Sequence, residues 1–540
     1  MDTNTQGAFG ASQRGKALVS TAGMVMVAFV LSRALGLVRV ALLGSIYGAG
    51  DALDAFNAAS RVTETLYILI AGGALGSAFI PTFTAYLARD RHQAAWQVAS
   101  AITNLVFVVA LTASIVTILI APWVVSRVLA PGFAPPVRSL TVALLRWMLV
   151  STVLFSVSGL LMGILNANDH YLLPALAPST YNLGIIGGVA LLSGRWGIYG
   201  AAIGTVIGAL LHLLVQLPAL RNLDWAYSPT LGLRTEGVRQ VARLMGPRVL
   251  GMAITQLNFW VNINLGSSIG VEGVVTALNY GWLLMLLPQG IFAQAIGTVL
   301  LPSLSAQAAR QERDALRATL LSALQIVFYL TVPATVGLIA LCRPLIEMFL
   351  MRGAFDNQDV MMAAWALAWY AVGLVAHSEL EIVTRAFYAL HDTATPVRVG
   401  AAAMALNVGF SLAFSWLFER IGLRPFGLPY QPWTPLGGLA LANSLATALE
   451  TGVLLWLLHR RLEGLDGRPA WTSLWRIALS AAAMGLAIAA YLRLMPTQSA
   501  WALGIGGMVI GAGTFFLATY LLRSPELGFI LGSLHRRGER

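Results

Sequence analysis

Four charged side chains in the first two apolar stretches of the sequence could bind an anion inside a membrane. Arg33 and Arg39 lie in the first stretch, and Arg61 and Glu64 lie one helical turn apart in the second. A charged group at membrane depth costs about 2.5–3.5 kcal/mol on insertion scales, so each of these charges needs a compensating role. Because guanidinium groups grip phosphate and carboxylate through paired N–H donors, the sequence predicts a cationic cavity for an anion such as a diphosphate.

Structural pairing is the alternative for these residues. Arg61 and Glu64 have the spacing of a helical ion pair, and Arg39 could pair with an aspartate in the connection that follows, Asp54. We predict three substrate-binding residues, Arg33, Arg39 and Arg61. We predict three structural or gating residues, Asp54, Glu64 and Gly36.

A second group of ionisable residues interrupts the apolar stretch 360–389 and consists of His377, Glu379, Glu381 and Arg385. Membrane-embedded acids of this kind occur in proton relays, so Glu379, Glu381 and Arg385 are predicted to couple transport to a proton or ion. The alternative is pairing, for instance of Arg385 with Asp392. We find no spacing typical of a metal site, a nucleophilic triad or a catalytic carboxylate pair. The sequence therefore predicts a transporter rather than an enzyme, with no cofactor and no metal.

The composition indicates the elements that carry these charges. Of 540 residues, 57% are hydrophobic and 11% are charged, less than half the charge of an ordinary soluble domain. This excludes a large soluble enzyme, a nucleic-acid-binding protein and a disordered scaffold, and it indicates an all-α polytopic membrane protein. We expect no removable signal peptide. The sequence predicts fourteen transmembrane helices, at 20–46, 58–87, 94–121, 140–165, 171–192, 197–220, 241–265, 272–301, 316–342, 360–389, 396–418, 436–458, 471–494 and 499–522.

The distribution of Lys and Arg orients the chain. An even number of spans puts both termini on one side, and most of the 34 Lys and Arg residues lie in the tails and the even-numbered connections. The positive-inside rule makes that side the cytoplasm, so the net charge of +11 needs no nucleic acid to explain it. The predicted parts are a cytoplasmic tail (1–19), a first lobe (20–220), a linker (221–240), a second lobe (241–458), a second linker (459–470), a helix pair (471–522) and a basic cytoplasmic tail (523–540).

One sequence pattern occurs twice, once in each half of the chain. Residues 76–89 and 297–310 both fit G-x4-P-S/T-x-S/T-A-x-x-A-R. Asp169 and Pro174 recur as Asp392 and Pro396, at nearly the same separation along the chain. The separation of the two copies maps the first six spans onto the next six in the same orientation. A parallel pseudo-repeat of two six-helix lobes is predicted, with the transport pathway between the lobes.

Several motifs resemble those of a known family. Ser32-Arg33, Gly36 and Arg39 are followed by Tyr47-Gly-Ala-Gly50 and Asp54-Ala-Phe56, and the later motifs are 297–305 and 385–397. From about residue 18 to 460 the sequence is similar to the MurJ/MviN lipid II flippases of the multidrug/oligosaccharidyl-lipid/polysaccharide exporter superfamily. The resemblance implies two six-helix lobes around a cavity, a last helix pair for the undecaprenyl tail, and substrate-binding roles for Arg33 and Arg39.

The resemblance also implies a function and a location. The protein is expected to flip lipid II, the polyprenyl-diphosphate-linked peptidoglycan precursor, across the bacterial cytoplasmic (inner) membrane by alternating access. Its expected partners are that lipid, membrane lipids and membrane proteins of peptidoglycan synthesis, and it is expected to be a monomer. The sequence departs from the family at two arginine positions. Ile68 occupies the position in span 2, and Trp282 lies near the position in span 8. The alternatives are therefore a flippase for another polyprenyl-linked envelope glycan, a cation-coupled drug exporter, or a membrane scaffold.

Overall fold

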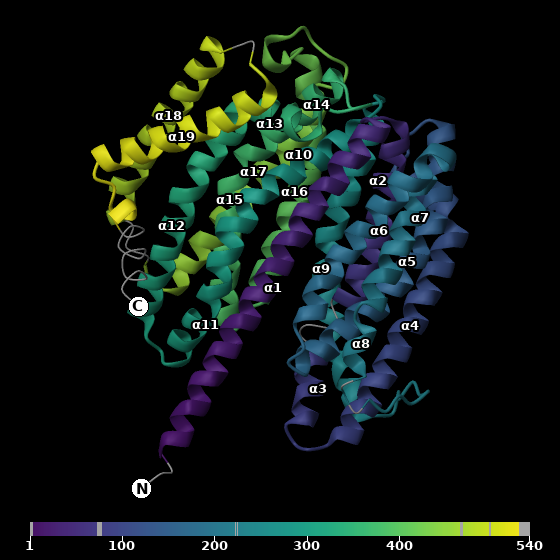
Figure 1. Ribbon diagram of the computed structural model, residues 1–540. Helices are drawn as coiled ribbons and strands as arrows, with labels where there is room; N and C mark the ends of the chain where they lie inside the picture. Colours follow the sequence, from purple (N-terminus) through teal and green to yellow (C-terminus); the bar gives the residue numbers. More distant parts are fainter. Residues whose placement is uncertain are drawn as a thin grey trace. The chain divides into compact units, whose positions relative to one another are not determined.

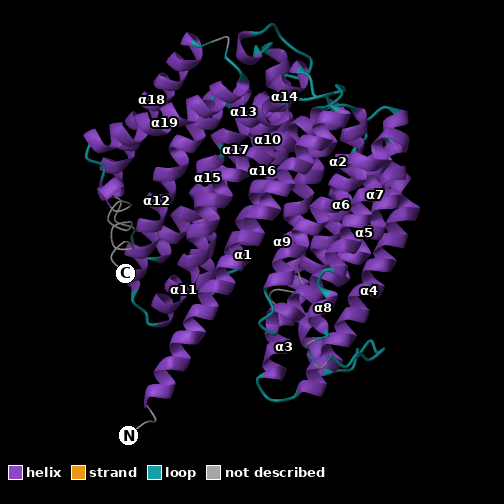
Figure 2. Cartoon of the chain, viewed as in Figure 1, coloured by secondary structure: helices purple, strands orange, loops and turns teal. Residues whose placement is uncertain are grey.

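The chain is helical throughout the part that the structure describes. The computed structural model describes the backbone of residues 4–72, 78–221, 223, 225–464, 468–495 and 498–528, and their side chains except in 4–22, 247, 248, 250 and 468–472. Every regular element in these ranges is a helix (Figure 2), so the all-α prediction is confirmed there. Parts of several predicted features lie outside the described residues: residues 1–3 of the first tail, Gly76 at the start of the first repeat motif, residues 222, 224 and 465–467 of the linkers, and residues 529–540 of the C-terminal tail.

Most of the helices are long and apolar enough to cross a membrane. Eleven helices meet this condition among the described residues, or twelve if α14 (Asn357–Val372) and α15 (Leu374–Ala389), which are bent by 47° at Gly373, form one span. The predicted count of fourteen is thus not confirmed. Within the predicted span 58–87, the described α-helices α2 and α3 end at Tyr67 and begin at Ile80, and each is short. The predicted span 241–265 carries five amide side chains within or close to it, which lower its mean hydropathy.

The chain divides into two compact units, Met1–Trp260 and Val261–Arg540. In the first unit α1 packs against α6, α2 against α5, and α6 lies beside α7 (Figure 1). A core of small and aromatic side chains, including Phe79, Phe83 and Trp96, lies where α3, α4 and α5 meet. The elements of this unit are α1 (Asn4–Tyr47), α2 (Asp51–Tyr67), the π-helical turn η1 (Ile68–Gly72), α3 (Ile80–Leu87), α4 (His92–Trp123), the π-helical turn η3 (Val124–Leu129), α5 (Pro135–Ala167), α6 (Leu172–Trp196), α7 (Tyr199–Leu214), α8 (Leu217–Leu220) and most of α9 (Glu236–Ser268).

The second unit holds the remaining helices, including a C-terminal helix pair. Its α10 packs against α14 and its α16 against α17, while α18 and α19 pack on α12 and α13 (Figure 1). Its remaining elements are α10 (Val274–Gln289), the π-helical turn η4 (Gly290–Gln294), α11 (Ala295–Ala309), α12 (Arg313–Ala340), α13 (Cys342–Leu350), α14, α15, α16 (Ala394–Arg420), the 3-10 turn η5 (Pro425–Gly427), α17 (Leu436–Arg461), α18 (Arg468–Leu494) and α19 (Ala500–Leu521).

The turns between helices recur at nearly the spacing of the sequence pattern. Left-handed backbone, with φ between 54° and 75°, occurs in the first unit at Gly48, Asp90 and Asp169 and in the second at the equivalent residues Gly270, Gln311 and His391. Few residues other than glycine adopt this conformation, so a chance match at three positions is improbable. The shared turns therefore support the predicted repeat.

Candidate functional site

The first two predicted arginines lie on α1, whose position is set by α6. Arg33 is exposed, and Arg39 is partly buried. The side-chain N–H of Asn182 on α6 donates to the carbonyl oxygen of Ser32 at 3.2 Å. A Cβ on Gly36 would lie 3.9 Å from the same Asn182 nitrogen, an ordinary van der Waals distance, so this contact does not require glycine. The predicted structural or gating role of Gly36 stays a prediction.

Arg39 lies near an aromatic side chain of α6. Its guanidinium carbon is 5.8 Å from the centre of the Tyr181 ring, within the range of a cation–π contact. Tyr181 is in turn packed edge-on against Phe155 of α5 at 4.8 Å. The ion pairs formed among the described residues include neither Arg33 nor Arg39. The substrate-binding roles of Arg33 and Arg39 stay predictions.

Arg61 is held more firmly than the other two arginines. Its Nη1 forms an ion pair with Glu64 Oε2 at 3.0 Å, and the Arg61 side chain is 17% exposed against 51% for Glu64. The pairing with Glu64 considered from the sequence is confirmed, and the substrate-binding role of Arg61 stays a prediction. The Arg61 guanidinium also lies over the ring of Phe259, with 4.3 Å between its carbon and the ring centre. A guanidinium stacked on a ring can still donate hydrogen bonds in its own plane.

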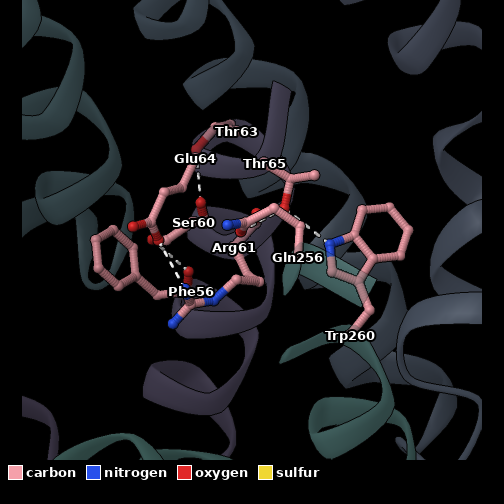
Figure 3. Close-up of polar contacts among 8 residues, drawn as sticks. All are labelled: Phe56, Ser60, Arg61, Thr63, Glu64, Thr65, Gln256 and Trp260. Carbon is pink, nitrogen blue, oxygen red and sulfur yellow. Dashed lines mark hydrogen bonds and ion pairs between the residues drawn. The ribbon is translucent and has the colours of Figure 1, made fainter. Parts of the chain in front are cut away.

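A chain of hydrogen bonds ties the Arg61 turn of α2 to α9 (Figure 3). Trp260 Nε1 donates to Thr65 Oγ1 at 2.9 Å, and Thr65 Oγ1 lies 2.7 Å from the carbonyl oxygen of Arg61. Gln256 Oε1 lies 3.5 Å from the same hydroxyl. Gln256, Phe259 and Trp260 occupy adjacent turns of one face of α9. This face therefore fixes both the backbone and the side chain of Arg61.

Asp54, the predicted gating acid, is 2% exposed and lies in the first turn of α2. Its backbone N–H donates to the carbonyl oxygen of Gly50 at 2.9 Å. An acidic residue in the first turn of a helix is favoured by the helix dipole, so Asp54 stabilises the start of the helix that carries Arg61. Its predicted structural role is consistent with this place, and its gating role stays a prediction.

The charged group of the second unit forms a local ion pair. Arg385 Nη2 lies 2.5 Å from Glu381 Oε1, and Arg385 Nε donates to the same oxygen at 3.2 Å. The pairing of Arg385 with Asp392 considered from the sequence is wrong, because Asp392 pairs with Arg461 at 2.5 Å. One helical turn separates Glu381 from Arg385, whereas Asp392 lies beyond the end of α15. Coupling to an ion by these residues and Glu379 stays a prediction.

Trp282, which lies near an arginine position of the family, packs among aromatic and polar groups. Its ring centre is 5.3 Å from those of Tyr370 and His377, both in edge-to-face contact. His377 Nε2 is 3.1 Å from Asn443 Oδ1 on α17. His377 is therefore part of a partly buried interhelical network, a role that was not predicted from the sequence.

The aromatic side chains that support the arginines, and one acid within a predicted span, were not predicted from the sequence. Phe259 and Trp260 follow Gln256 at helical spacing, a pattern that could have pointed to a face contacting α2. Glu450 lies within the apolar helix α17, and a Cβ on Gly400 of α16 would be 3.0 Å from its Oε1. An acid inside an apolar span was a signal in the sequence.

Comparison with known proteins decides the family. The family model described as lipid II flippase MurJ matches residues 43–509. The chain belongs to this family. A lipid II flippase MurJ of Burkholderia cenocepacia is 31% identical over 521 residues, which cover 91% of this chain and 97% of the relative. A probable lipid II flippase MurJ of Vibrio cholerae is 29% identical over 531 residues, 95% of this chain and 97% of the relative.

Solved structures agree with the MurJ assignment. A lipid II flippase MurJ in an inward closed conformation is similar with a TM-score of 0.76 and 25% identity, over 92% of this chain and 98% of that one. An inward-facing multidrug resistance MATE family transporter of the MOP superfamily has a TM-score of 0.66 at 16% identity, over 82% of this chain and 99% of that one. The second likeness concerns the fold alone. The chain is a multi-pass membrane protein with the fold of MurJ.

Proposed function

We propose that this protein is a lipid II flippase of the bacterial inner membrane. The observation that carries the proposal is the MurJ family match over residues 43–509, joined by relatives named lipid II flippase MurJ over nearly their full length. The arginines of α1 and α2 supply the chemistry that such a cargo needs. A transporter role, rather than catalysis, follows from that family.

The diphosphate of the cargo is the group that the arginines would bind. Arg33 is exposed, Arg39 lies beside Tyr181, and Arg61 is stacked on Phe259. Each guanidinium can donate paired hydrogen bonds to phosphate oxygens. The aromatic supports restrict the Arg39 and Arg61 side chains before the cargo arrives, which lowers the entropy cost of binding.

Alternating access is the mechanism that we propose. The diphosphate head enters from the cytoplasm near Arg33 and Arg39 while the prenyl tail stays in lipid, and the cavity then opens to the other side. The membrane potential acts on any net charge that moves in this cycle. Glu379, Glu381 and Arg385 are the residues proposed to respond to a coupled ion.

The proposed topology has fourteen spans with both termini in the cytoplasm. Two lobes (20–220 and 241–458) form a parallel repeat, and the pair at 471–522 contacts the prenyl tail. The recurring turns at Gly48 and Gly270 and at Asp169 and His391 support the repeat, and the protein is proposed to act as a monomer.

Rescue of a bacterium depleted of its own lipid II flippase tests the proposal. The wild-type gene should restore growth, and Arg33→Ala should abolish rescue because the cargo loses a diphosphate contact. Arg195→Ala is the matched control, since Arg195 is exposed at the end of α6 and should rescue fully. Failure of the wild-type gene at normal membrane expression would reject lipid II as the cargo.

The replacement of two family arginines favours one second candidate. With Ile68 and Trp282 at or near those positions, a different polyprenyl-diphosphate glycan is the alternative cargo. Deletion of the gene would then accumulate another lipid-linked intermediate and leave peptidoglycan precursors unchanged.

A further inference from the structure

Each unit has a π-helical turn at the same place in its second span. In the first unit the turn is η1 (Ile68–Gly72), and in the second it is η4 (Gly290–Gln294), at the equivalent position of the repeat. A π-helical turn holds one residue more than an α-helical turn and weakens the hydrogen-bond ladder locally. Such turns are among the few causes of a sharp change in helix direction.

The two turns also have equivalent surroundings. The η1 turn packs against α4 and α5, and η4 packs against α12 and α15, their counterparts in the second unit. In each turn a single residue is buried, and the two buried residues, Ala71 in η1 and Ala293 in η4, are equivalent in the repeat. The other residues of the two turns are half-buried or exposed, among them Ile70, which packs on the neighbouring core. Few fully buried side chains must therefore repack when the backbone rotates there.

In the second unit the segment beyond the turn is held by a side chain that lies across it. A Cβ on Gly297 of α11 would be 2.5 Å from Nε of Arg385 and 2.9 Å from its Cδ and Cζ. Arg385 on α15 is oriented by its two contacts with Glu381. The guanidinium therefore rests directly on the backbone of α11, at the glycine that opens the repeated sequence pattern.

We propose that η4 is a hinge for α11 and that Arg385 is its latch. The hinge lets α11 pivot relative to α15, and Arg385, seated on Gly297 and oriented by Glu381, holds the position seen in this structure. The equivalent turn η1 gives the first unit a hinge at the corresponding point. This device does not depend on which lipid the protein carries.

A distance measurement on the whole protein tests the hinge. Spin labels would be placed at Ser303→Cys on α11 and Val453→Cys on α17, both exposed, with the one native cysteine, Cys342, replaced by serine. In lipid nanodiscs without cargo, the wild-type pair should give two distance populations. Gly297→Ala should raise the displaced population at least threefold, since the new methyl group cannot coexist with Arg385 in its present place.

Three further variants separate the hinge and the latch from a general packing defect. Arg385→Lys should also raise the displaced population, because lysine loses the planar contact with both Gly297 and Glu381. Deletion of Ile291, which is 66% exposed, should restore α-helical spacing and leave one population. Gly409→Ala is the control, because nothing lies within 4 Å of a Cβ there.

The proposal is overturned if the wild type shows one population that neither the glycine variant nor the deletion changes. It is equally overturned if Gly297→Ala and Arg385→Lys both match the control. The distance measurement contains no cargo, so its outcome is independent of lipid transport. A protein that shows both populations but moves no lipid II would support the hinge and contradict the proposed flippase function.

Discussion

The three arginines of the first unit differ in how firmly their surroundings hold them. Arg33 is exposed on α1, Arg39 lies 5.8 Å from the Tyr181 ring centre, and Arg61 lies 4.3 Å from that of Phe259 while pairing with Glu64. The most restrained arginine is therefore the one whose support comes from α9. Arg33 is the most available to a cargo, and Arg61 is the best oriented.

Removing the ring beneath Arg61 should weaken transport. A cation–π contact is worth about 0.5–1 kcal/mol when exposed and about 2 kcal/mol when desolvated. Phe259→Leu should therefore slow lipid flipping by roughly two- to thirtyfold while the Glu64 pair persists. Flipping by reconstituted protein measures this, with Phe107→Leu as control because Phe107 is 44% exposed on α4. Equal rates in the two variants would show that the ring does not position Arg61.

The folding stability of the second unit should depend on the charge of Asp392 and therefore on pH. The backbone N–H of Thr395 holds the pKa of the Asp392 carboxyl below its ordinary value, and the Thr395 hydroxyl and Arg461 act in the same direction. Because the pKa is lower in the folded state, the carboxylate stabilises the fold above its unfolded pKa of about 3.9. This contribution to stability is lost as the pH falls through the pKa of Asp392 in the folded state.

Thermal melting of Asp392→Asn in detergent tests this dependence. The variant should melt below the wild type at about pH 7, and the difference between the two should shrink as the pH falls below the unfolded pKa of about 3.9. Asp314→Asn is the control, since Asp314 is 95% exposed beside Arg317 and should melt like the wild type at both values. A difference for Asp392→Asn that persists unchanged in acid would exclude a charge effect.

At the scale of the elements, glycines decide how closely α6 and α7 cross. A Cβ on Gly188 would overlap the Cα of Gly204, whereas a Cβ on Gly187 would have no neighbour within 4 Å. Small residues let membrane helices approach until their backbones touch. The two adjacent glycines thus have opposite expected responses to substitution.

Replacing each of these glycines by alanine compares the two positions directly. Gly188→Ala should destabilise the protein by about 1–3 kcal/mol, since rigid backbone must move. Gly187→Ala should be neutral or stabilising by up to about 1 kcal/mol, because alanine is the better helix former. Melting temperatures in detergent give both values. A Gly188→Ala protein that melts with the wild type would contradict the close crossing.

The sequence predicted elements better than it predicted contacts between them. Apolar length and the repeated pattern were sufficient for the helical class and for most spans, because membrane insertion depends on composition along one segment. The Arg61–Glu64 pair was predictable for the same reason, since both residues lie on one turn. The Phe259 ring under Arg61 and the Arg385 side chain on Gly297 were not, because each joins helices far apart in sequence.

At the scale of the whole molecule, the proposed fourteen-span topology makes a prediction at each connection. Cysteines at exposed positions such as Asp90 and Arg313 should be labelled only from the cytoplasmic side, and one at Arg195 only from outside. Native Cys342 is buried and should give little background with a membrane-impermeant reagent. Labelling of Asp90→Cys from outside in intact cells would contradict the orientation.

Transport of lipid II by the purified protein is the direct test of the proposed flippase function. Proteoliposomes containing the wild type should move fluorescent lipid II between leaflets, whereas Arg33→Ala should move it at least tenfold more slowly and Arg195→Ala at the wild-type rate. A second polyprenyl-diphosphate glycan, tested in parallel, should move more slowly than lipid II. Rapid movement of that glycan with none of lipid II would contradict lipid II as the cargo. Equal rates for all three proteins would contradict a substrate-binding role of Arg33.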